Sequence, residues 1–288
     1  HPVDYTILNR KVSAARLGHA YSVHGITGSL GWALAPAMLV PLAAAFGWRV
    51  ALLAAAGLIF TVLAIVFWRR RVLELPPTPH VAQHASQPAE SAFGFLRIPA
   101  VWMCFAFFFF YAAVLSVIQT FATSSATHLT NVPATLAAMC LTAYMVASAG
   151  GMVVGGFLVA DASRAERIVG MGFGVAAMFA LTMALTPVPG VLVPVLFVGM
   201  GFASGIAGPS RDMLVKRSTP ENATGRVYGV VYAGLDIGQA VMPLIFGALM
   251  DHGQYRAVWF GLALLQGVLI ASAFNVRRVR RTLRPAMA

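Results

Sequence analysis

The chain has 288 residues, of which 59% are hydrophobic and only 10% are charged, and its mean hydropathy is +0.79. A soluble domain carries about 25% charged residues, so this composition excludes a water-soluble globular protein. The net charge of +11 is compatible with nucleic-acid binding, but the distribution of the charges, described below, argues against it. Cys104 and Cys140 stand apart in apolar stretches, which is typical of buried thiols rather than of a disulfide or a metal site.

Apolar runs long enough to cross about 30 Å of hydrocarbon recur along the chain. Glycine and proline are scattered through these runs, as membrane helices tolerate. We expect eight complete membrane-spanning helices, at Gly18–Phe46, Val50–Trp68, Ile98–Ala122, Ala134–Ala160, Ile168–Leu185, Val191–Met213, Val227–Met250 and Ala257–Asn275. The first nine residues, HPVDYTILN, have the pattern of the end of a further helix.

The basic residues alternate between the connections that join these helices. One set of connections holds Arg10, Lys11, Arg16, Arg69, Arg70, Arg71, Arg97, Arg164, Arg167, Arg211, Lys216, Arg217, Arg226, Arg277, Arg278, Arg280, Arg281 and Arg284, whereas the other holds only Arg49 and Arg256. Loops rich in lysine and arginine stay in the cytoplasm, so the first set is predicted to be cytoplasmic. A basic face next to anionic lipid explains the net charge, and we expect no nucleic-acid partner.

The longest connection, residues 69–97, is rich in proline, serine, glutamine and histidine, which is typical of a flexible linker. Six predicted helices follow it. A gapless shift of 207 residues aligns residues 2–72 with 209–279 and gives 17 identities in 71 positions, against roughly one in ten expected by chance. Parallel repeats of this kind mark the two halves of transporters. The same shift predicts that about 109 residues precede His1, which makes the first half incomplete.

Two motifs add to this pattern. The segment GGFLVADASRAER (Gly155–Arg167) resembles the second copy of the glycine-then-aspartate loop of the major facilitator superfamily, with one extra residue before Asp161 and alanine where the family usually has arginine. The segment HGITGSLGWALAP (His24–Pro36) resembles the glycine-rich helix 5 motif of the proton-coupled exporters in that family. The resemblance covers essentially the whole chain and implies an all-α membrane protein with two pseudo-symmetric six-helix halves.

The resemblance also implies a division of the chain. Residues 1–68 would be the remainder of the N-terminal half, with the end of helix 4 and helices 5 and 6. Residues 69–97 would be the cytoplasmic linker, residues 98–276 the C-terminal half with helices 7 to 12, and residues 277–288 a basic cytoplasmic tail.

Small residues and prolines inside the helices have two interpretations. They either pack helices statically or form a surface that slides and bends during alternating access, because small residues spaced four apart let membrane helices approach closely and proline permits a bend. The candidates for such gating or packing are Gly28, Gly31, Pro36, Gly151, Gly155, Asp161 and Arg164, the last as a substitute in the loop motif's ion pair.

Asp236 is the most informative polar residue, because it lies near the middle of a predicted span. A charged aspartate there costs on the order of 2.5–3.5 kcal/mol, so it should face a cavity or a partner. Burial favours the neutral acid, which makes Asp236 a candidate proton carrier, although a structural hydrogen bond to a neighbouring helix is the alternative. Tyr228, Tyr232 and Gln239 are expected on the same helix face, because the spacings are 4, 4 and 3.

Two further groups are candidates for the substrate or proton site. A polar stripe in the first helix after the linker consists of Ser116, Gln119, Thr120 and Thr123, with Tyr111 farther inward. By the family resemblance this helix lines the central cavity. The repeat equates Ser29 with Asp236 and Trp32 with Gln239, and His24 lies on the same helix. Serine and threonine can instead satisfy their own helix, and a single histidine can serve only packing.

These observations predict a secondary active transporter of a small molecule, coupled to protons, working by alternating access in the cell inner membrane, with export favoured over import. The alternatives are an ion-coupled importer of a small metabolite such as an organic acid, and a non-transporting membrane scaffold. No catalytic constellation, nucleotide-binding motif or metal-spaced cluster is visible, so we expect no enzyme activity, cofactor or metal. The expected partners are substrate, protons and lipid, and the expected state is a monomer.

Overall fold

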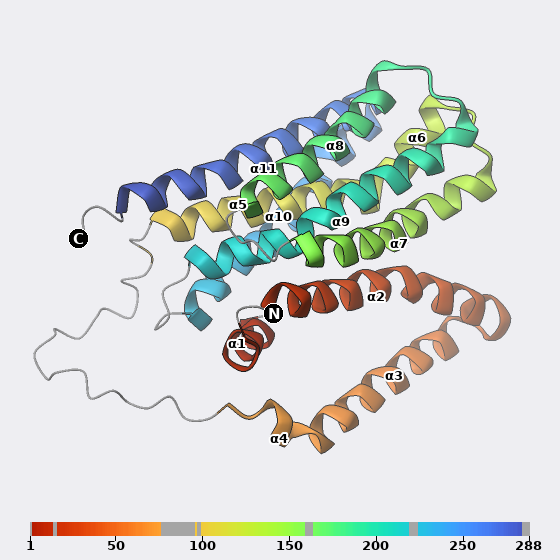
Figure 1. The fold of residues 1–288 in the computed structure, drawn as a ribbon. Coiled ribbons are helices and arrows are strands. Elements are labelled where there is room, and N and C mark those ends of the chain that lie inside the picture. The colour runs from red at the N-terminus through yellow and green to blue at the C-terminus, as the bar shows by residue number, and fades with distance from the viewer. Residues whose placement is uncertain are drawn as a thin grey trace, which may run out of the picture.

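The computed structural model describes residues 2–13, 16–75, 96, 99–158, 164–218 and 224–283, and for some residues inside the helices it describes only the backbone. The regular elements of these residues are helical (Figure 1). In chain order they are α1 (Pro2–Lys11), α2 (Leu17–Phe46), α3 (Trp48–Trp68), α4 (Arg70–Leu73), α5 (Pro99–Val117), η2 (Ile118–Ala122), α6 (Thr123–Leu129), α7 (Ala134–Leu158), α8 (Ala165–Leu185), η4 (Gly190–Leu192), α9 (Val193–Ser218), α10 (Thr224–Asp251) and α11 (Tyr255–Leu283).

Seven helical segments in the described part of the chain are long and apolar enough to cross a membrane. They are Trp48–Trp68, Val101–Leu129, Ala134–Leu158, Ala165–Leu185, Gly190–Arg211, Gly229–Asp251 and Tyr255–Phe274. Each coincides with a span predicted from the sequence. The remaining prediction, Gly18–Phe46, coincides with α2, whose side chains are described only in part. The all-helical membrane fold is therefore confirmed.

The first helix after the linker differs most from its prediction. It does not end at Ala122 but continues as α6 to Leu129, and residues Ile118–Ala122 form a π-helical turn, η2. Hydroxyl groups stabilise the extra turns, since Thr127 Oγ1 donates to the Ser124 carbonyl at 2.7 Å and Thr130 Oγ1 to the Ala126 carbonyl at 2.9 Å. A π turn takes one more residue than an α turn, so it changes which side chains share a face. Near the end of the chain, α11 continues to Leu283, into the segment predicted as a tail.

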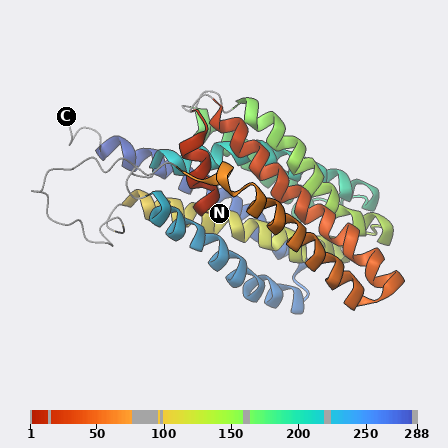
Figure 2. The ribbon, with the colours of Figure 1, turned by 90° about the horizontal axis from the view of Figure 1, so that it is seen from below.

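Six long helices, α5 and α7 to α11, pack into one group, with α7 against α9, α5 against α10, and α8 against both α9 and α11 (Figure 1). Helix α2 lies along α7, and α3 contacts α2 near the turn that joins them and diverges from it (Figure 1; Figure 2 gives a second view). Helix α1 contacts α10 and α2. The apolar side chains of α3 are largely exposed, as expected for a helix that faces lipid.

Glycines explain the tightest contact in the group, between α7 and α9. A Cβ atom on Gly151 would lie 2.2 Å from the Phe202 carbonyl oxygen, and one on Gly155 would lie 2.3 Å from that of Ile206. On the facing helix, a Cβ on Gly205 would lie 2.1 Å from the Ser148 carbonyl oxygen. These backbones can touch only because the glycines have no side chain, which is how membrane helices associate without a hydrophobic driving force between them.

The two helix pairs related by the sequence repeat turn in the same way. Helices α2 and α3 join at Gly47 with φ of 85°, and α10 and α11 join through Gly253 with φ of 69°. Both values lie in the left-handed region that glycine adopts without a steric penalty. Each connection thus contains one positive-φ glycine, although the shift of 207 residues aligns Gly47 with Gln254 rather than with Gly253.

Candidate substrate cavity

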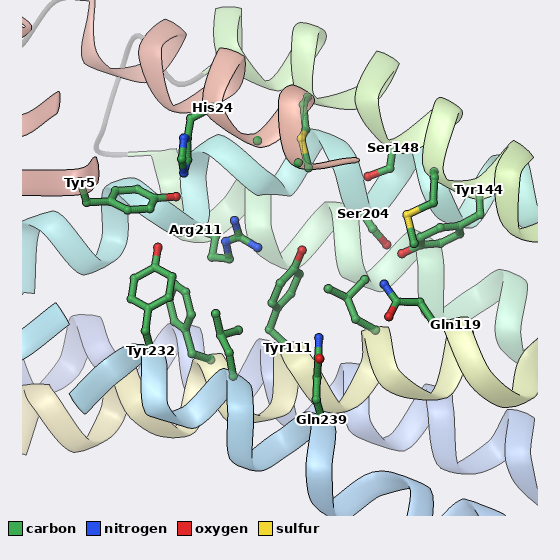
Figure 3. Close-up of a pocket in the computed structure, with 17 residues that line it drawn as sticks. Tyr5, His24, Tyr111, Gln119, Tyr144, Ser148, Ser204, Arg211, Tyr232 and Gln239 are labelled. Atoms are coloured by element: carbon green, nitrogen blue, oxygen red, sulfur yellow. The ribbon is translucent and has the colours of Figure 1, made fainter. Parts of the chain in front are cut away.

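A cavity of about 200 Å³ lies between α1 and α2 on one side and α5, α7, α9 and α10 on the other (Figure 3). Its volume is below the ~300–1,000 Å³ of pockets that bind drug-sized ligands, so it fits a small molecule. Its lining consists of Tyr5, His24, Gly25, Gly28, Phe108, Tyr111, Leu115, Gln119, Tyr144, Met145, Ser148, Met152, Ser204, Arg211, Tyr232, Leu235 and Gln239.

Aromatic side chains from four helices meet at one end of this cavity. Tyr5 of α1 lies with its ring centroid 5.1 Å from that of His24 on α2 and 5.5 Å from that of Tyr232 on α10. The Tyr232 ring is 5.0 Å from that of Phe108 on α5. Ring pairs at 4.5–7 Å attract one another beyond their burial, so this chain of rings joins α1 and α2 to the six-helix group. Tyr5 is only 2% exposed and Tyr232 only 8%.

Arg211 of α9 lies in the middle of the cavity wall, where Figure 3 shows its guanidinium group between His24 and Tyr111. The side chain is 8% exposed. Its guanidinium carbon lies 4.2 Å from the centre of the Tyr111 ring and 5.5 Å from that of Phe108. Cation–π contacts within about 6 Å stabilise a desolvated arginine. Two rings of α5 thus hold a permanent positive charge at the cavity.

The other end of the cavity is polar and uncharged. Gln119, Tyr144, Ser148, Ser204 and Gln239 gather there from four helices (Figure 3). The Ser204 hydroxyl is buried and lies beside the Tyr144 hydroxyl (Figure 3). Gln119 belongs to the π turn η2, which fits the frequent occurrence of such turns at functional sites. This end can form hydrogen bonds with a polar group of a ligand.

Six of the residues singled out from the sequence come together around the cavity. They are His24 and Gly28 of α2, Tyr111 of α5, Gln119 of η2, and Tyr232 and Gln239 of α10. The structure therefore brings together residues from the two sides of the linker.

Asp236 does not lie where the sequence pattern suggested. It is exposed and is not among the residues that line the cavity. Tyr232, Leu235 and Gln239 define the cavity face of α10, and at 100° per residue Asp236 lies about 70° to one side of that face. Its role in proton transfer stays a prediction.

The polar stripe of the first helix after the linker is divided, with only Gln119 in the cavity. Ser116 instead contacts α10, where its hydroxyl donates to the Gln239 carbonyl at 3.3 Å, and Thr120 is exposed. The prediction assumed α-helical spacing, which the π turn η2 interrupts.

The other candidates lie elsewhere. Gly151 and Gly155 lie against α9, the position of a Cβ on Gly31 faces open space, and Arg164 is exposed at the start of α8. The side chains of Ser29, Trp32, Pro36 and Tyr228, and Asp161 as a whole, lie outside the described residues.

Several cavity residues were not predicted, and Arg211 is the main one. The pattern of basic residues predicted that Arg211 lies in a cytoplasmic connection, which is wrong because α9 continues to Ser218 and Arg211 is buried in the cavity wall. An arginine inside a predicted span, two residues after Pro209, was the available signal. Tyr144 and Ser148, four apart in an apolar helix, were a second signal, whereas Tyr5 offered none.

Comparison with known proteins identifies the family. The model of the Major Facilitator Superfamily matches residues 1–232 and 127–286, nearly the whole chain. The chain belongs to this superfamily. A curated relative, the multi-drug resistance efflux pump PmrA homolog of Lactococcus lactis subsp. cremoris, is 29% identical over 83 residues, which are 28% of this chain and 70% of that protein.

Membership of the Major Facilitator Superfamily confirms that the chain is a multi-pass membrane transporter and not an enzyme. In the part of the chain that the structure describes, no three histidine, cysteine, aspartate or glutamate side chains are grouped as they would be to hold a metal ion.

Proposed function

We propose that this chain acts as a proton-coupled secondary transporter that exports a small molecule across the cell inner membrane by alternating access. The cavity carries this proposal, because residues from both sides of the linker line it. Residues 1–68 and 98–276 would be the two moving parts, with 69–97 as the cytoplasmic linker and 277–288 as the cytoplasmic tail. A site enclosed by two such parts can open to either side in turn.

The contact between α2 and α7 is suited to such a movement. A Cβ on Gly25 would meet the flexible end of Met152, and one on Gly156 would meet the Ser22 side chain. The Ser22 hydroxyl donates to the Met152 carbonyl, which gives a side-chain hydrogen bond between these surfaces. Small residues let membrane helices approach closely, and sliding of packed helices is a known form of domain movement. The aromatic contact of Tyr5 with Tyr232 would open and close one end of the cavity.

The direction of transport is supported by the relative, which is named as a multi-drug resistance efflux pump. Efflux against a gradient needs an energy source, and the motif at His24–Pro36 resembles that of proton-coupled exporters. We therefore favour exchange of substrate for protons. A monomer suffices for this mechanism, because the cavity is enclosed by helices of one chain.

Asp236 is the proposed proton carrier. It is near the middle of α10, and its neighbour Leu235 lines the cavity. The sequence repeat aligns α2 with α10. Helix α2 contacts α7 at Ser22 and Gly25, and the repeat aligns these two residues with Gly229 and Tyr232 of α10. Gly229 and Tyr232 lie on the side of α10 that holds Asp236. That side would be covered by a helix in the assembled transporter, so the carboxyl group would meet protein and cavity water rather than lipid.

The test is pH-driven substrate transport by the full-length protein in proteoliposomes. Asp236→Asn keeps the size of the side chain and removes its proton exchange, so accumulation driven by a pH gradient should be abolished while substrate binding persists. Asp251→Asn, at the exposed end of the same helix, is the matched control and should transport normally. Normal pH-driven accumulation by Asp236→Asn would exclude Asp236 as the proton carrier.

One observation favours the second candidate, an ion-coupled importer of an organic acid. A buried arginine at the cavity, Arg211, suits an anionic substrate. Export and import are distinguished in proteoliposomes by the direction of the imposed proton gradient that causes substrate to accumulate.

A further inference from the structure

We infer that the cavity selects small organic anions, with a carboxylate bound to Arg211 and an apolar, ring-sized body against Phe108 and Tyr111. This inference rests on the proposed function only in treating the cavity as the substrate site. Neither the family nor the name of the relative specifies a charge for the substrate.

The charge of the lining is the first step. Arg211 is the only lysine or arginine among the described residues that line the cavity, and none of these residues is an aspartate or glutamate. The described lining residues therefore contribute one permanent positive charge, that of Arg211. In an environment of low dielectric constant a positive lining attracts an anion and repels an organic cation much more strongly than in water.

The position of the guanidinium group is the second step. Its contacts with the Tyr111 and Phe108 rings, at 4.2 and 5.5 Å, restrict a long side chain that would otherwise lose rotamer freedom on binding. Arginine presents its N–H groups in a planar fork that matches both oxygens of a carboxylate. A carboxylate bound there gains charge-assisted hydrogen bonds, which are about twice as strong as neutral ones.

The rest of the lining defines the body of the ligand. Phe108, Leu115, Met145, Met152 and Leu235 give an apolar wall, and methionine adapts to ligands of varied shape. An inorganic anion such as phosphate could not use this wall. The cavity volume of about 200 Å³ limits the body to about one ring. Gln119 and Gln239, at the other end, can bond to a polar substituent on that ring.

Benzoate is the probe, with benzamide and benzylammonium as neutral and cationic molecules of the same shape. Binding to the purified full-length protein is measured by calorimetry and by the ligand-induced rise in melting temperature. We expect benzoate to bind at least tenfold more tightly than benzamide, and benzylammonium to show no binding. If the unaltered protein bound benzamide as tightly as benzoate, or benzylammonium more tightly than benzoate, the inference would be overturned without any variant.

Variants then identify the residue responsible. Arg211→Gln should weaken benzoate binding at least tenfold and leave benzamide binding unchanged, and Arg211→Lys should retain part of the preference for the anion. Arg256→Gln, an exposed arginine at the start of α11, is the control and should bind like the unaltered protein. Unchanged benzoate binding by a folded Arg211→Gln protein would contradict the inference; if that variant does not fold, the three-ligand comparison decides.

Equilibrium binding does not depend on coupling, so the two proposals can fail separately. Arg211-dependent benzoate binding without pH-driven transport would reject proton coupling and retain the anion site. Proton-coupled transport of neutral or cationic solutes with no binding of benzoate would reject the anion site and retain proton coupling.

Discussion

The glycine contact between α7 and α9 gives a sharp test of the packing, because Gly150 and Gly151 are adjacent in the chain but differently placed. A Cβ on Gly151 would lie 2.2 Å from the Phe202 carbonyl oxygen and 3.0 Å from the Ile206 nitrogen, whereas one on Gly150 would meet nothing within 4 Å. The first distance is about 1.2 Å short of an ordinary contact, which begins at 3.4 Å. Both obstructing atoms belong to the backbone, so a change of rotamer cannot relieve the overlap.

Replacing either glycine by alanine gains the same helix propensity, about 1 kcal/mol. The difference between Gly150→Ala and Gly151→Ala therefore isolates the steric cost, which for overpacking is about 1–3 kcal/mol. With a shift of about 2–4 °C per kcal/mol, Gly151→Ala should melt on the order of 2–12 °C below Gly150→Ala. Gly150→Ala should melt at or above the temperature of the unaltered protein.

A thiol-reactive fluorescent dye measures this melting, because Cys104 and Cys140 are free and buried and become reactive when the helices separate. Protein expression and monodispersity are compared before each measurement. The same displacement would move Ser148 and Ser204 in the cavity wall, so ligand binding should weaken as well. Equal melting temperatures for the two alanine variants would refute the close backbone contact and with it the described packing of α7 on α9.

Three further predictions concern the membrane topology, the ring that contacts Arg211, and the contact between α2 and α7. Single cysteines are placed at Ala85 and at Gln254 in a protein without Cys104 and Cys140. An impermeant thiol reagent should label the first only from the cytoplasm and the second only from outside; the opposite result would reverse the predicted topology. Tyr111→Ala should weaken benzoate binding about 2- to 30-fold by removing the 4.2 Å contact with Arg211, whereas Tyr111→Phe keeps the ring and should bind normally; equal losses would assign the effect to the hydroxyl. Ser22→Ala should destabilise the protein by about 0.6 kcal/mol, because it removes the hydrogen bond to the Met152 carbonyl, and Thr27→Ala, whose hydroxyl bonds only within α2, should melt like the unaltered protein.

Parts of the candidate site were visible in the sequence. Tyr232 and Gln239 share a face through helical spacing alone, and both line the cavity. The same spacing placed Asp236 with them, but the face that closes on the cavity is centred to one side of it. Spacing fixes the angles between side chains on one helix, and only the neighbouring helices decide which of those angles faces the cavity.

The amino-acid sequence by itself determined the class of the protein, the positions of its spans and its family. These features are properties of consecutive residues: apolar length matched to the bilayer, basic loops and a repeat at constant offset. The tertiary structure decided the cavity. Tyr5, Tyr144 and Arg211 all line it although they are far apart in the chain. Arg211 lies in the cavity wall rather than in a loop because α9 extends past it and the rings of α5 cover it. Such contacts depend on the distance between helices. Between α7 and α9 this distance is set by backbone contact at the glycines, and no local sequence pattern encodes it.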